Sequence, residues 1–477
     1  MYLLMRSKEG KASVAIIILG VIILLALIPW YLVLSRNFDF DFFGGGDEDS
    51  VPAQTEEEAS EEPEIPIETT PLPEIEPEPL PEIEQGSEVA NAYTITDIAT
   101  GDPELFRELN EITKEYNAVA AGMVLFDGNA GEFYTYKYGH ADRSGGQMID
   151  DNTRFRVASL AKLITVICAM VLVDEEYIDL DEDITTYLGY EVTNTNYPGS
   201  PVTTRMLMQH TSSIFDSGVF QASRDRNSSE SVRYLLERGS SFRRNEPGSN
   251  FEYTNFGYSV LGAVCESVSG KSLDTLARDV LFNPLDIDAA YVPAKMRDTV
   301  NIAVIYDERH SVTRSVESQL EIEESNMLGH DLHLAQGNLT ISVLDYARIL
   351  AMLGNGGTLN GVTILSPGAV RDINNTDVEG ASYKQGLGTR FSVGGFIQNE
   401  GFYWHTGSAY GTFAQYVYSD VNNTNRGAVV VTTGAATGRG SNGMVDVCTD
   451  LAVTAWRELE FSAARNEMSD DDGDEFD

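Results

Sequence analysis

The sequence predicts an α+β fold, in which an antiparallel β-sheet is flanked by helices and accompanied by a helical lobe. Strand-like segments lie at both ends of the central region, helix-like segments lie between them, and no internal repeat is present. Strands from both ends can join in one sheet while the helices are inserted between them. With 477 residues, of which 42% are apolar, the chain is long enough to bury a sizeable core.

The N-terminus predicts a transmembrane helix. Residues 12–34 form an apolar run that is long enough to cross a hydrocarbon core of about 30 Å. Basic residues precede the run and only Arg36 follows it closely, so residues 1–11 are expected in the cytoplasm and the rest of the chain outside. A cleaved signal peptide is the alternative, but the run is longer than a usual signal and no small-x-small site follows it.

Residues 35–101 are predicted to form a disordered acidic stalk. The segment is rich in Pro and Glu, and every charged residue from Asp39 to Glu88 is acidic. Such a segment buries too little apolar surface to fold, and in an extended form at about 3.1 Å per residue, sixty residues of it could reach on the order of 150 Å. A disordered acidic tail is predicted over 466–477. Calcium binding is the alternative to a solvated spacer for the acidic run.

The remaining residues, 102–465, are predicted to be one folded domain. The formal net charge of the whole chain is -42, which argues against a nucleic-acid partner because phosphate binding needs clustered Lys and Arg. Cys168, Cys265 and Cys448 each lie in an apolar, helix-like stretch, so buried free thiols are expected. A bridge between one pair of them stays open.

The elements of this domain follow from hydrophobic patterning. A strand pair is expected around the turn at residues 127–131, and the apolar run from Leu160 to Val173 is expected to be a buried helix. Further helices are predicted at 258–268, 343–353 and 445–459, and further strands at Trp404, 413–418 and 427–433.

The first chemical motif is Ser159-Leu160-Ala161-Lys162, at the start of the apolar helix. Residues three apart on a helix share a face. An amine that is buried near the positive end of a helix is less readily charged, and a partly neutral amine beside a hydroxyl is a competent base for a nucleophile. The structural alternative is a capping Ser and a Lys that reaches to solvent.

Two further motifs carry polar side chains. Tyr253-Thr254-Asn255 offers a phenol for proton transfer and an amide that can donate to and accept from a substrate amide. In His405-Thr406-Gly407-Ser408, the Gly lets another backbone approach an edge strand, where the N–H of Ser408 can meet a carbonyl oxygen. His405 and Thr406 are candidates for holding a substrate carboxylate. The alternatives are a turn and a polar strand end.

Together the order S-x-x-K, Y-x-N, H-T-G is typical of serine acyl transfer. The motifs stand in surroundings such as VASLAKLITVICAMVLVDEEYIDLDEDITTYL and PGSNFEYTNFGYSVLGAVCESVSGKSL. In these segments the chain resembles the class C β-lactamase and D-alanyl-D-alanine carboxypeptidase family of penicillin-recognising serine hydrolases. The resemblance covers residues 119–459 and implies a β-lactamase/transpeptidase-like fold.

The resemblance also implies roles. Ser159 would be the acylated nucleophile, Lys162 would take its proton, and Tyr253 would serve deacylation or protonate the leaving group. Asn255, His405, Thr406 and Gly407 would bind substrate, and the N–H groups of Ser159 and Ser408 would form the oxyanion hole. The chain departs from the family at Ser213, where many relatives have Gly, at His405, where the β-lactamases have Lys, and in an insertion at 300–333. A metal at His330, Asp331 and His333 is weighed against a solvated loop, and the loop is favoured.

The expected protein is a membrane-anchored, extracytoplasmic serine hydrolase that needs no metal or other cofactor. Its expected substrate is a cell-wall peptide or D-alanyl ester, which would make it a D-alanyl-D-alanine carboxypeptidase or D-alanyl esterase. The alternatives are an esterase, a D-amino-acid amidase or a β-lactamase with the same site, or a non-catalytic envelope-binding module. Location alone is an associational argument, because one fold hosts many substrates.

Overall fold

The computed structural model describes residues 93–225, 231–237, 240–379, 383–393, 401–420 and 423–457. The predicted transmembrane helix at 12–34, the acidic tail at 466–477 and most of the predicted stalk lie outside the described residues. Within the described ranges, no helix is long and apolar enough to cross a membrane. The last part of the predicted stalk, residues 94–101, is folded as β1 (Thr94–Asp97) and α2 (Ile98–Gly101). The folded domain therefore begins before residue 102, because Ile98 is buried in its core.

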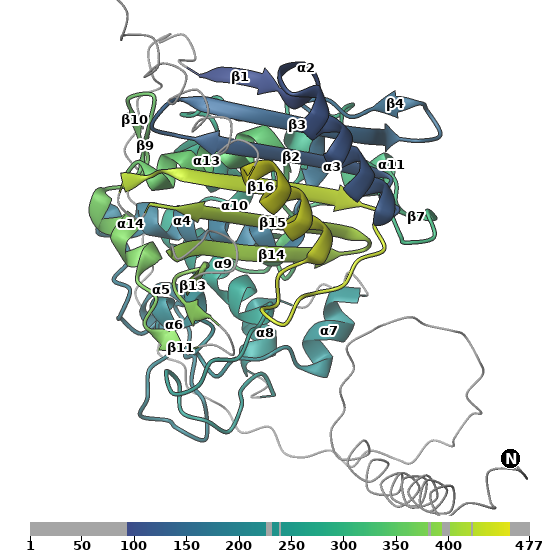
Figure 1. Ribbon diagram of the computed structural model, residues 1–477. Helices are drawn as coiled ribbons and strands as arrows, with labels where there is room; N and C mark the ends of the chain where they lie inside the picture. Colours follow the sequence, from purple (N-terminus) through teal and green to yellow (C-terminus); the bar gives the residue numbers. More distant parts are fainter. Residues whose placement is uncertain are drawn as a thin grey trace, which may run out of the picture. The chain divides into compact units, whose positions relative to one another are not determined.

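A ten-stranded sheet forms the centre of the domain (Figure 1). Its order is β1-β3-β2-β16-β15-β14-β13-β12-β11, and β4 pairs with β3. The remaining strands of the sheet are β2 (Ala120–Asp127), β3 (Glu132–Asp142), β4 (Gln147–Met148), β11 (Val378–Glu379), β12 (Lys384–Gln385), β13 (Arg390–Val393), β14 (Gly401–Ala409), β15 (Thr412–Ser419) and β16 (Arg426–Thr433). The predicted hairpin and the predicted C-terminal strands are confirmed, and the two ends of the domain meet where β16 pairs with β2.

The sheet is mixed, so the prediction of an antiparallel sheet is wrong at one edge. β1 runs parallel to β3, in the register Thr94↔Glu132 to Asp97↔Thr135. Consecutive strands joined by a tight turn must be antiparallel, as β2 and β3 are. β1 is instead connected to β2 through α2 and α3 (Pro103–Glu115), so no short turn fixes the direction of β1 in the sheet.

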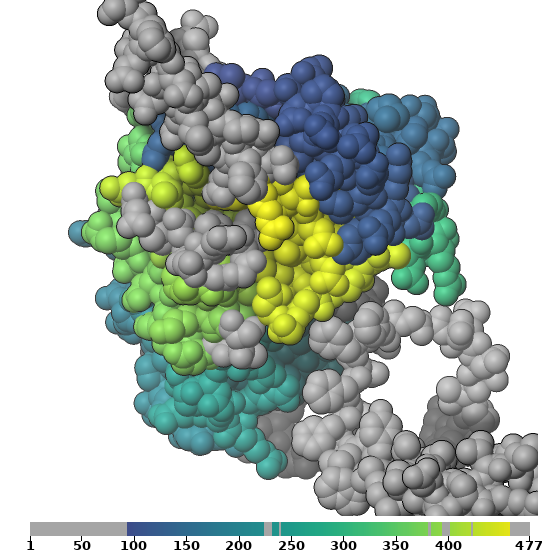
Figure 2. All heavy atoms as spheres, viewed as in Figure 1, coloured from purple at the N-terminus to yellow at the C-terminus, as the bar shows by residue number. Residues whose placement is uncertain are grey.

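Helices cover both faces of the sheet. On one face α3 and the helix over residues 446–457 lie side by side, dark blue and yellow in Figure 2. On the other face lie α4 (Ala161–Asp174), α9 (Phe256–Ser269) and α13 (Val343–Gly354). Side chains of β16 alternate between two cores: Val429 and Val431 belong to the core that contains α4 and α13, and Val430 belongs to the core that contains α3. The predicted helices are thus confirmed, and the central strands are buried on both sides.

The helical lobe is formed by the chain between α4 and α9. Its helices are α5 (Thr185–Leu188), α6 (Thr204–Met208), α7 (Gly218–Asp225) and α8 (Val232–Glu237). The shorter elements elsewhere are η2 (Ala158–Leu160), α10 (Leu273–Ala277), η3 (Arg278–Phe282), η4 (Pro293–Lys295), α11 (Val316–Leu320), α12 (Leu334–Gly337), α14 (Pro367–Asn374), and the strand pairs β5 (Arg154–Arg156) with β8 (Thr340–Ser342), β6 (Ile305–Tyr306) with β7 (Val312–Arg314), and β9 (Thr358–Leu359) with β10 (Val362–Thr363). The three cysteines are buried and free, as expected.

Candidate active site

Ser159 lies in the 3-10 turn η2, which leads directly into α4. The preceding Ala158 has a φ of 49°, in the left-handed region that non-glycine residues rarely adopt. Strand β14 packs against this turn. A Cβ on Gly407 would lie 2.4 Å from the Val157 carbonyl oxygen and 3.2 Å from the Ser159 amide nitrogen. Gly407 therefore permits a close backbone approach, as predicted, and the backbone that approaches it is the Ser159 turn.

Lys162 lies in the first turn of α4 with its side chain fully buried. Its Nζ is 3.4 Å from Ser159 Oγ, 2.9 Å from Asn255 Oδ1 and 2.6 Å from the Gln336 carbonyl oxygen. The two carbonyl-type oxygens can only accept, so they take two hydrogens of Nζ. The third direction of Nζ faces the Ser159 hydroxyl, and this arrangement allows a proton to pass between the two groups.

Tyr253 completes the group around Ser159. Its hydroxyl is 2.9 Å from Ser159 Oγ, and Lys162 Nζ lies 5.0 Å from the centre of its ring. The structure therefore brings Ser159, Lys162 and Tyr253 into mutual contact, although 94 residues separate the serine from the tyrosine. A hydroxyl with two proton-carrying neighbours is what activation of a nucleophile requires.

Asp216 orients this group, and sequence reasoning missed it. Its Oδ1 accepts hydrogen bonds from Thr254 Oγ1 and from the N–H groups of Asn255 and Phe256, and its Oδ2 accepts from Asn255 Nδ2. Because Asp216 takes the amide nitrogen of Asn255, the amide oxygen is turned toward Lys162. Asp216 is thus a positioning residue for Lys162.

The open edge of β14 begins beside Ser159. β13 pairs with β14 only as far as Trp404. The two-residue turn after Ala409 makes Ala409 and Thr412 a hydrogen-bonded pair of the β14–β15 hairpin. Hydrogen-bonded pairs alternate along an antiparallel ladder, so the N–H of Ser408 points away from β15, toward the open edge. This orientation agrees with the predicted oxyanion hole.

His405 is buried and neutral. Its Nδ1 is 2.8 Å from the Thr406 carbonyl oxygen, which can only accept, so Nδ1 carries the hydrogen and Nε2 is a lone-pair acceptor. Nε2 has no hydrogen-bond partner among the described groups. Burial, followed by the charges of Arg390 and Lys162, holds the pKa of His405 well below its ordinary value. Thr406 Oγ1 accepts from Arg439 Nη1 at 2.9 Å.

Two arginines supply the positive charge at this end of the site. The Arg390 guanidinium lies 5.7 Å from the ring centre of Tyr253 and 5.1 Å from that of Trp404, and it makes no ion pair with a described carboxylate. Its Nε is buried without a hydrogen-bond partner within the described chain. Arg439 reaches Thr406 from the loop after β16. Neither arginine belongs to a local motif, so sequence reasoning had no signal for them.

His210 is a further buried group beside Tyr253, with ring centres 4.4 Å apart. Its Nδ1 accepts from the Thr254 N–H, and burial holds its pKa well below the ordinary value. His210 lies in the segment VTTRMLMQHTSSI, from which sequence reasoning could have identified it as a candidate site residue. Ser213, in the same segment, has a φ of 63°, which explains why Gly suits this position. Its Oγ accepts a hydrogen bond from Asn194 Nδ2, which compensates in part for the strain of this backbone conformation.

The predicted insertion is folded and packs against the sheet. Between residues 300 and 333 it forms β6, β7 and α11, and its apolar side chains join small cores. Asp331 Oδ1 accepts from the N–H groups of His333 and Leu334 at the start of α12. Its carboxylate therefore caps a helix. Over the described ranges, no group of three or more metal-binding side chains is found.

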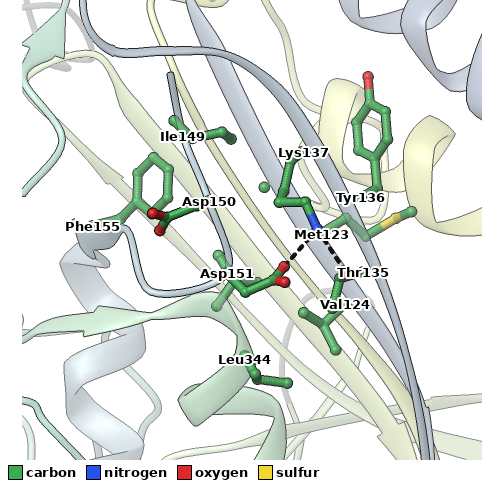
Figure 3. Close-up of a pocket in the computed structure, with 12 residues that line it drawn as sticks. Met123, Val124, Thr135, Tyr136, Lys137, Ile149, Asp150, Asp151, Phe155 and Leu344 are labelled. Carbon is green, nitrogen blue, oxygen red and sulfur yellow. Dashed lines mark hydrogen bonds and ion pairs between the residues drawn. The ribbon is translucent and has the colours of Figure 1, made fainter. Parts of the chain in front are cut away.

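A small hollow lies beside β3. It is lined by residues that include Met123, Thr135, Ile149 and Phe155, and its volume is about 10 Å³ (Figure 3). Lys137 Nζ in this hollow bonds Asp151 and Thr135 and also pairs with Asp97. This is room for a single water at most. Lys137 instead ties β1 and the loop after β4 to β3.

Comparisons with known proteins agree with this geometry. The profile of the Beta-lactamase family matches residues 105–446. The chain is 29% identical over 175 residues to "Penicillin-binding protein 4" of Amycolatopsis lactamdurans, which covers 36% of this chain and 44% of that protein. It is 30% identical over 191 residues to "Esterase EstB" of Burkholderia gladioli, which covers 36% of this chain and 48% of that protein. The chain thus spans less than half the length of these curated relatives.

Solved structures share the fold. The octameric penicillin-binding protein homologue from Pyrococcus abyssi superposes with a TM-score of 0.60 at 18% identity, over 75% of this chain and 77% of that chain. At this identity the likeness concerns the fold, which is the β-lactamase/transpeptidase-like α+β fold.

Proposed function

This chain belongs to the Beta-lactamase family of serine hydrolases, and we propose that it hydrolyses D-alanyl peptides or D-alanyl esters through an acyl-enzyme at Ser159. One observation carries the proposal: Ser159 Oγ lies within hydrogen-bonding reach of both Tyr253 and Lys162. The two curated relatives are named as a penicillin-binding protein and an esterase, so they support acyl transfer without choosing the acyl donor.

In the proposed acylation, Lys162 takes the Ser159 proton as Oγ attacks the substrate carbonyl carbon. The negative charge on the carbonyl oxygen is stabilised by the N–H groups of Ser159 and Ser408. The bond to the leaving group then breaks, and Tyr253 protonates the leaving nitrogen or oxygen, which leaves a Tyr253 phenolate and a protonated Lys162. In deacylation, water gives a proton to the Tyr253 phenolate and attacks the ester, Lys162 returns its proton to Ser159 Oγ, and the acid is released.

The charges around the leaving group favour a carboxylate there. Arg390 and Arg439 lie beyond Tyr253 and Thr406, and no ion pair with a described carboxylate neutralises either guanidinium. Asn255, His405 and Gly407 complete the proposed binding surface. A leaving group that ends in a carboxylate, such as D-alanine, could form ion pairs with these two cations, whereas a simple alcohol could form none. We therefore rank a carboxypeptidase above a general esterase.

Two alternatives follow from particular observations. The likeness to "Esterase EstB" favours an esterase with the same three residues. A β-lactamase ranks lower because His405 is neutral where the β-lactamases have Lys. A non-catalytic module ranks lowest because Ser159, Lys162 and Tyr253 are all present and in contact.

The test combines labelling and turnover. Full-length protein treated with a fluorophosphonate should gain the mass of one adduct on Ser159, and it should release D-alanine from a D-Ala-D-Ala peptide or a D-alanyl ester faster than it hydrolyses nitrocefin. Lys162→Ala should abolish labelling, and Tyr253→Phe should slow turnover by about 10²–10⁴-fold while still allowing the adduct to form. Wild-type labelling of Lys162→Ala would refute the assignment of the base, and fast nitrocefin turnover without D-alanine release would reverse the ranking.

We also propose that the domain faces the extracytoplasmic side of a membrane, anchored by residues 12–34. The apolar run and its flanking charges support this location. External protease on intact cells should release a soluble active fragment that is cut in the Glu/Pro segment. Recovery of the active domain only after lysis would refute the topology.

A further inference from the structure

The site has a second cationic end, on the side of Ser159 opposite to Tyr253. Strand β14 runs from His405 past Gly407, which faces the Ser159 turn, to the hairpin turn at Tyr410. Tyr253 and Arg390 lie at the His405 end. Tyr410 is three residues beyond Gly407, about 10 Å along the strand. The two ends therefore receive the two substituents of the carbonyl carbon that Ser159 attacks.

Two guanidinium groups gather on the Tyr410 ring. The Arg314 guanidinium lies 3.7 Å from the ring centre and that of Arg156 lies 4.9 Å from it. Arg156 is three residues before Ser159, and its Nε donates to the Gly337 carbonyl oxygen, next to the Gln336 carbonyl that accepts from Lys162. Tyr410 is 43% exposed, so a ligand can reach it from solvent. Arg156 thus links this cluster to the segment whose Gln336 carbonyl oxygen accepts from Lys162.

Arg314 has no carboxylate partner in the described chain. Its Nη1 donates to the Thr313 carbonyl oxygen, and no ion pair joins it to a described residue. The nearby Asp307 carboxylate instead accepts from the N–H groups of Arg309 and Ser311. In a chain with a net charge of -42, two adjacent cations over one exposed ring are an exception to the prevailing charge. An anion bound beside the Arg314 guanidinium would gain a favourable charge interaction.

The β6–β7 hairpin holds this cluster in place. Thr313 Oγ1 donates to the Tyr410 carbonyl oxygen, and a Cβ on Gly411 would lie 2.0 Å from the Tyr306 carbonyl oxygen. The hairpin and the β14–β15 turn are therefore packed backbone to backbone. A guanidinium held by packing loses little entropy when it binds a carboxylate or phosphate.

We propose that Arg314, Arg156 and Tyr410 form an acyl-side subsite that selects substrates whose acyl group carries an anionic substituent, such as a carboxylate. The proposal rests on the proposed acyl transfer at Ser159. The leaving group occupies the Tyr253 end because it must receive a proton there. The acyl chain then extends along β14 toward Tyr410, where an anion on it meets the Arg314 guanidinium.

The test uses two matched activated esters with full-length protein. Mono-4-nitrophenyl adipate carries a free carboxylate at the far end of its acyl chain, and methyl 4-nitrophenyl adipate is its neutral counterpart. Wild-type protein should show a higher kcat/KM for the anionic ester, mainly through a lower KM. Arg314→Gln should reduce the ratio of the two kcat/KM values by about tenfold. Arg314→Lys, which keeps the charge but not the planar fork, should reduce it less.

Arg309→Gln is the matched control, because Arg309 is an exposed cation in the same hairpin and has no contact with Tyr410. It should leave the ratio unchanged. A wild-type ratio near one, or equal loss of both activities in Arg314→Gln, would overturn the subsite, the latter because it reports a structural role. Absence of any ester hydrolysis by the wild type would instead overturn the proposed function, so the two failures are distinguishable.

Discussion

Replacement of Asp216 by Asn tests whether the network behind Lys162 sets the reactivity of Ser159. Asp216 accepts four hydrogen bonds, three on Oδ1 and one, from Asn255 Nδ2, on Oδ2. Asn at this position can keep the three bonds to its oxygen, but its NH₂ group then faces the NH₂ group of Asn255. Two donors cannot satisfy each other, so one bond is lost and the pair repels.

The amide of Asn255 can relieve that mismatch only by rotating. Its oxygen would then face the introduced amide, and its nitrogen would face Lys162 Nζ in place of the present 2.9 Å bond from Nζ to Oδ1. The unfavourable contact between two donors would then lie at Lys162 instead of at position 216. We expect Asp216→Asn to lower the free energy of unfolding by about 1–3 kcal/mol. The rate of Ser159 labelling should fall about 10²-fold, because the proton acceptor is displaced.

A compensating change separates the two effects. In Asp216→Asn with Asn255→Asp, the amide donor and the carboxylate acceptor are exchanged, so the bond between the two side chains is restored. The new carboxylate at position 255 also faces Lys162 Nζ and holds it as an ammonium ion. Stability should therefore return toward the wild-type value while labelling stays slow.

The assays are urea denaturation for stability and intact-mass measurement of fluorophosphonate labelling for the rate. Unchanged labelling in Asp216→Asn would refute the positioning role of Asp216. Recovery of both stability and labelling in the double variant would show that the amide orientation, and not the charge state of Lys162, is what matters. Either result would require a different account of how Ser159 is activated.

Two further predictions follow from buried contacts. Gly407→Ala should place a Cβ 2.4 Å from a main-chain oxygen of the Ser159 turn, which should lower the labelling rate about 10²-fold and destabilise the fold by about 1–3 kcal/mol. In the control Gly199→Ala, the added Cβ meets nothing within 4 Å, so neither the labelling rate nor the stability should change. Equal effects of the two substitutions would refute the close approach. Burial raises the pKa of Glu266 to about 7, so the folded state binds a proton that the unfolded state releases, and stability is lost as pH rises. Relative to Glu266→Gln, the wild type should lose about 2–3 kcal/mol of unfolding free energy between about pH 5 and pH 8, measured by denaturation; a constant difference would contradict the shift.

Much of the fold could be predicted because its signals are local. The run after Ser159 and the alternating strands near residues 413–433 carry their own periodicity, and the predicted strands and helices were confirmed. The direction of β1 could not be predicted, because the pairing of an edge strand that follows no tight turn depends on the whole sheet. The boundary near residue 102 was misplaced because β1 is short and follows an acidic segment directly.

The candidate site shows the same division. Ser159, Lys162 and Tyr253 lie in motifs with fixed spacing, and the structure brings them together. Arg390 and Arg439 come from β13 and from a loop, where no pattern distinguishes a functional arginine from a solvated one. Their significance depends on which carboxylates are absent nearby, and that property exists only in the folded chain.

The electrostatics around Ser159 follow from which buried groups stay neutral. His210 and His405 both contact the Tyr253 ring, and burial holds the pKa of each well below its ordinary value. The histidines therefore add no positive charge near neutral pH. The permanent positive charge along the site comes from the arginines at the two ends of β14. Because the arginines stay charged at all physiological pH values, an anionic substrate would be held equally well across that range, and any pH dependence of turnover must arise in the proton transfers between Ser159, Lys162 and Tyr253.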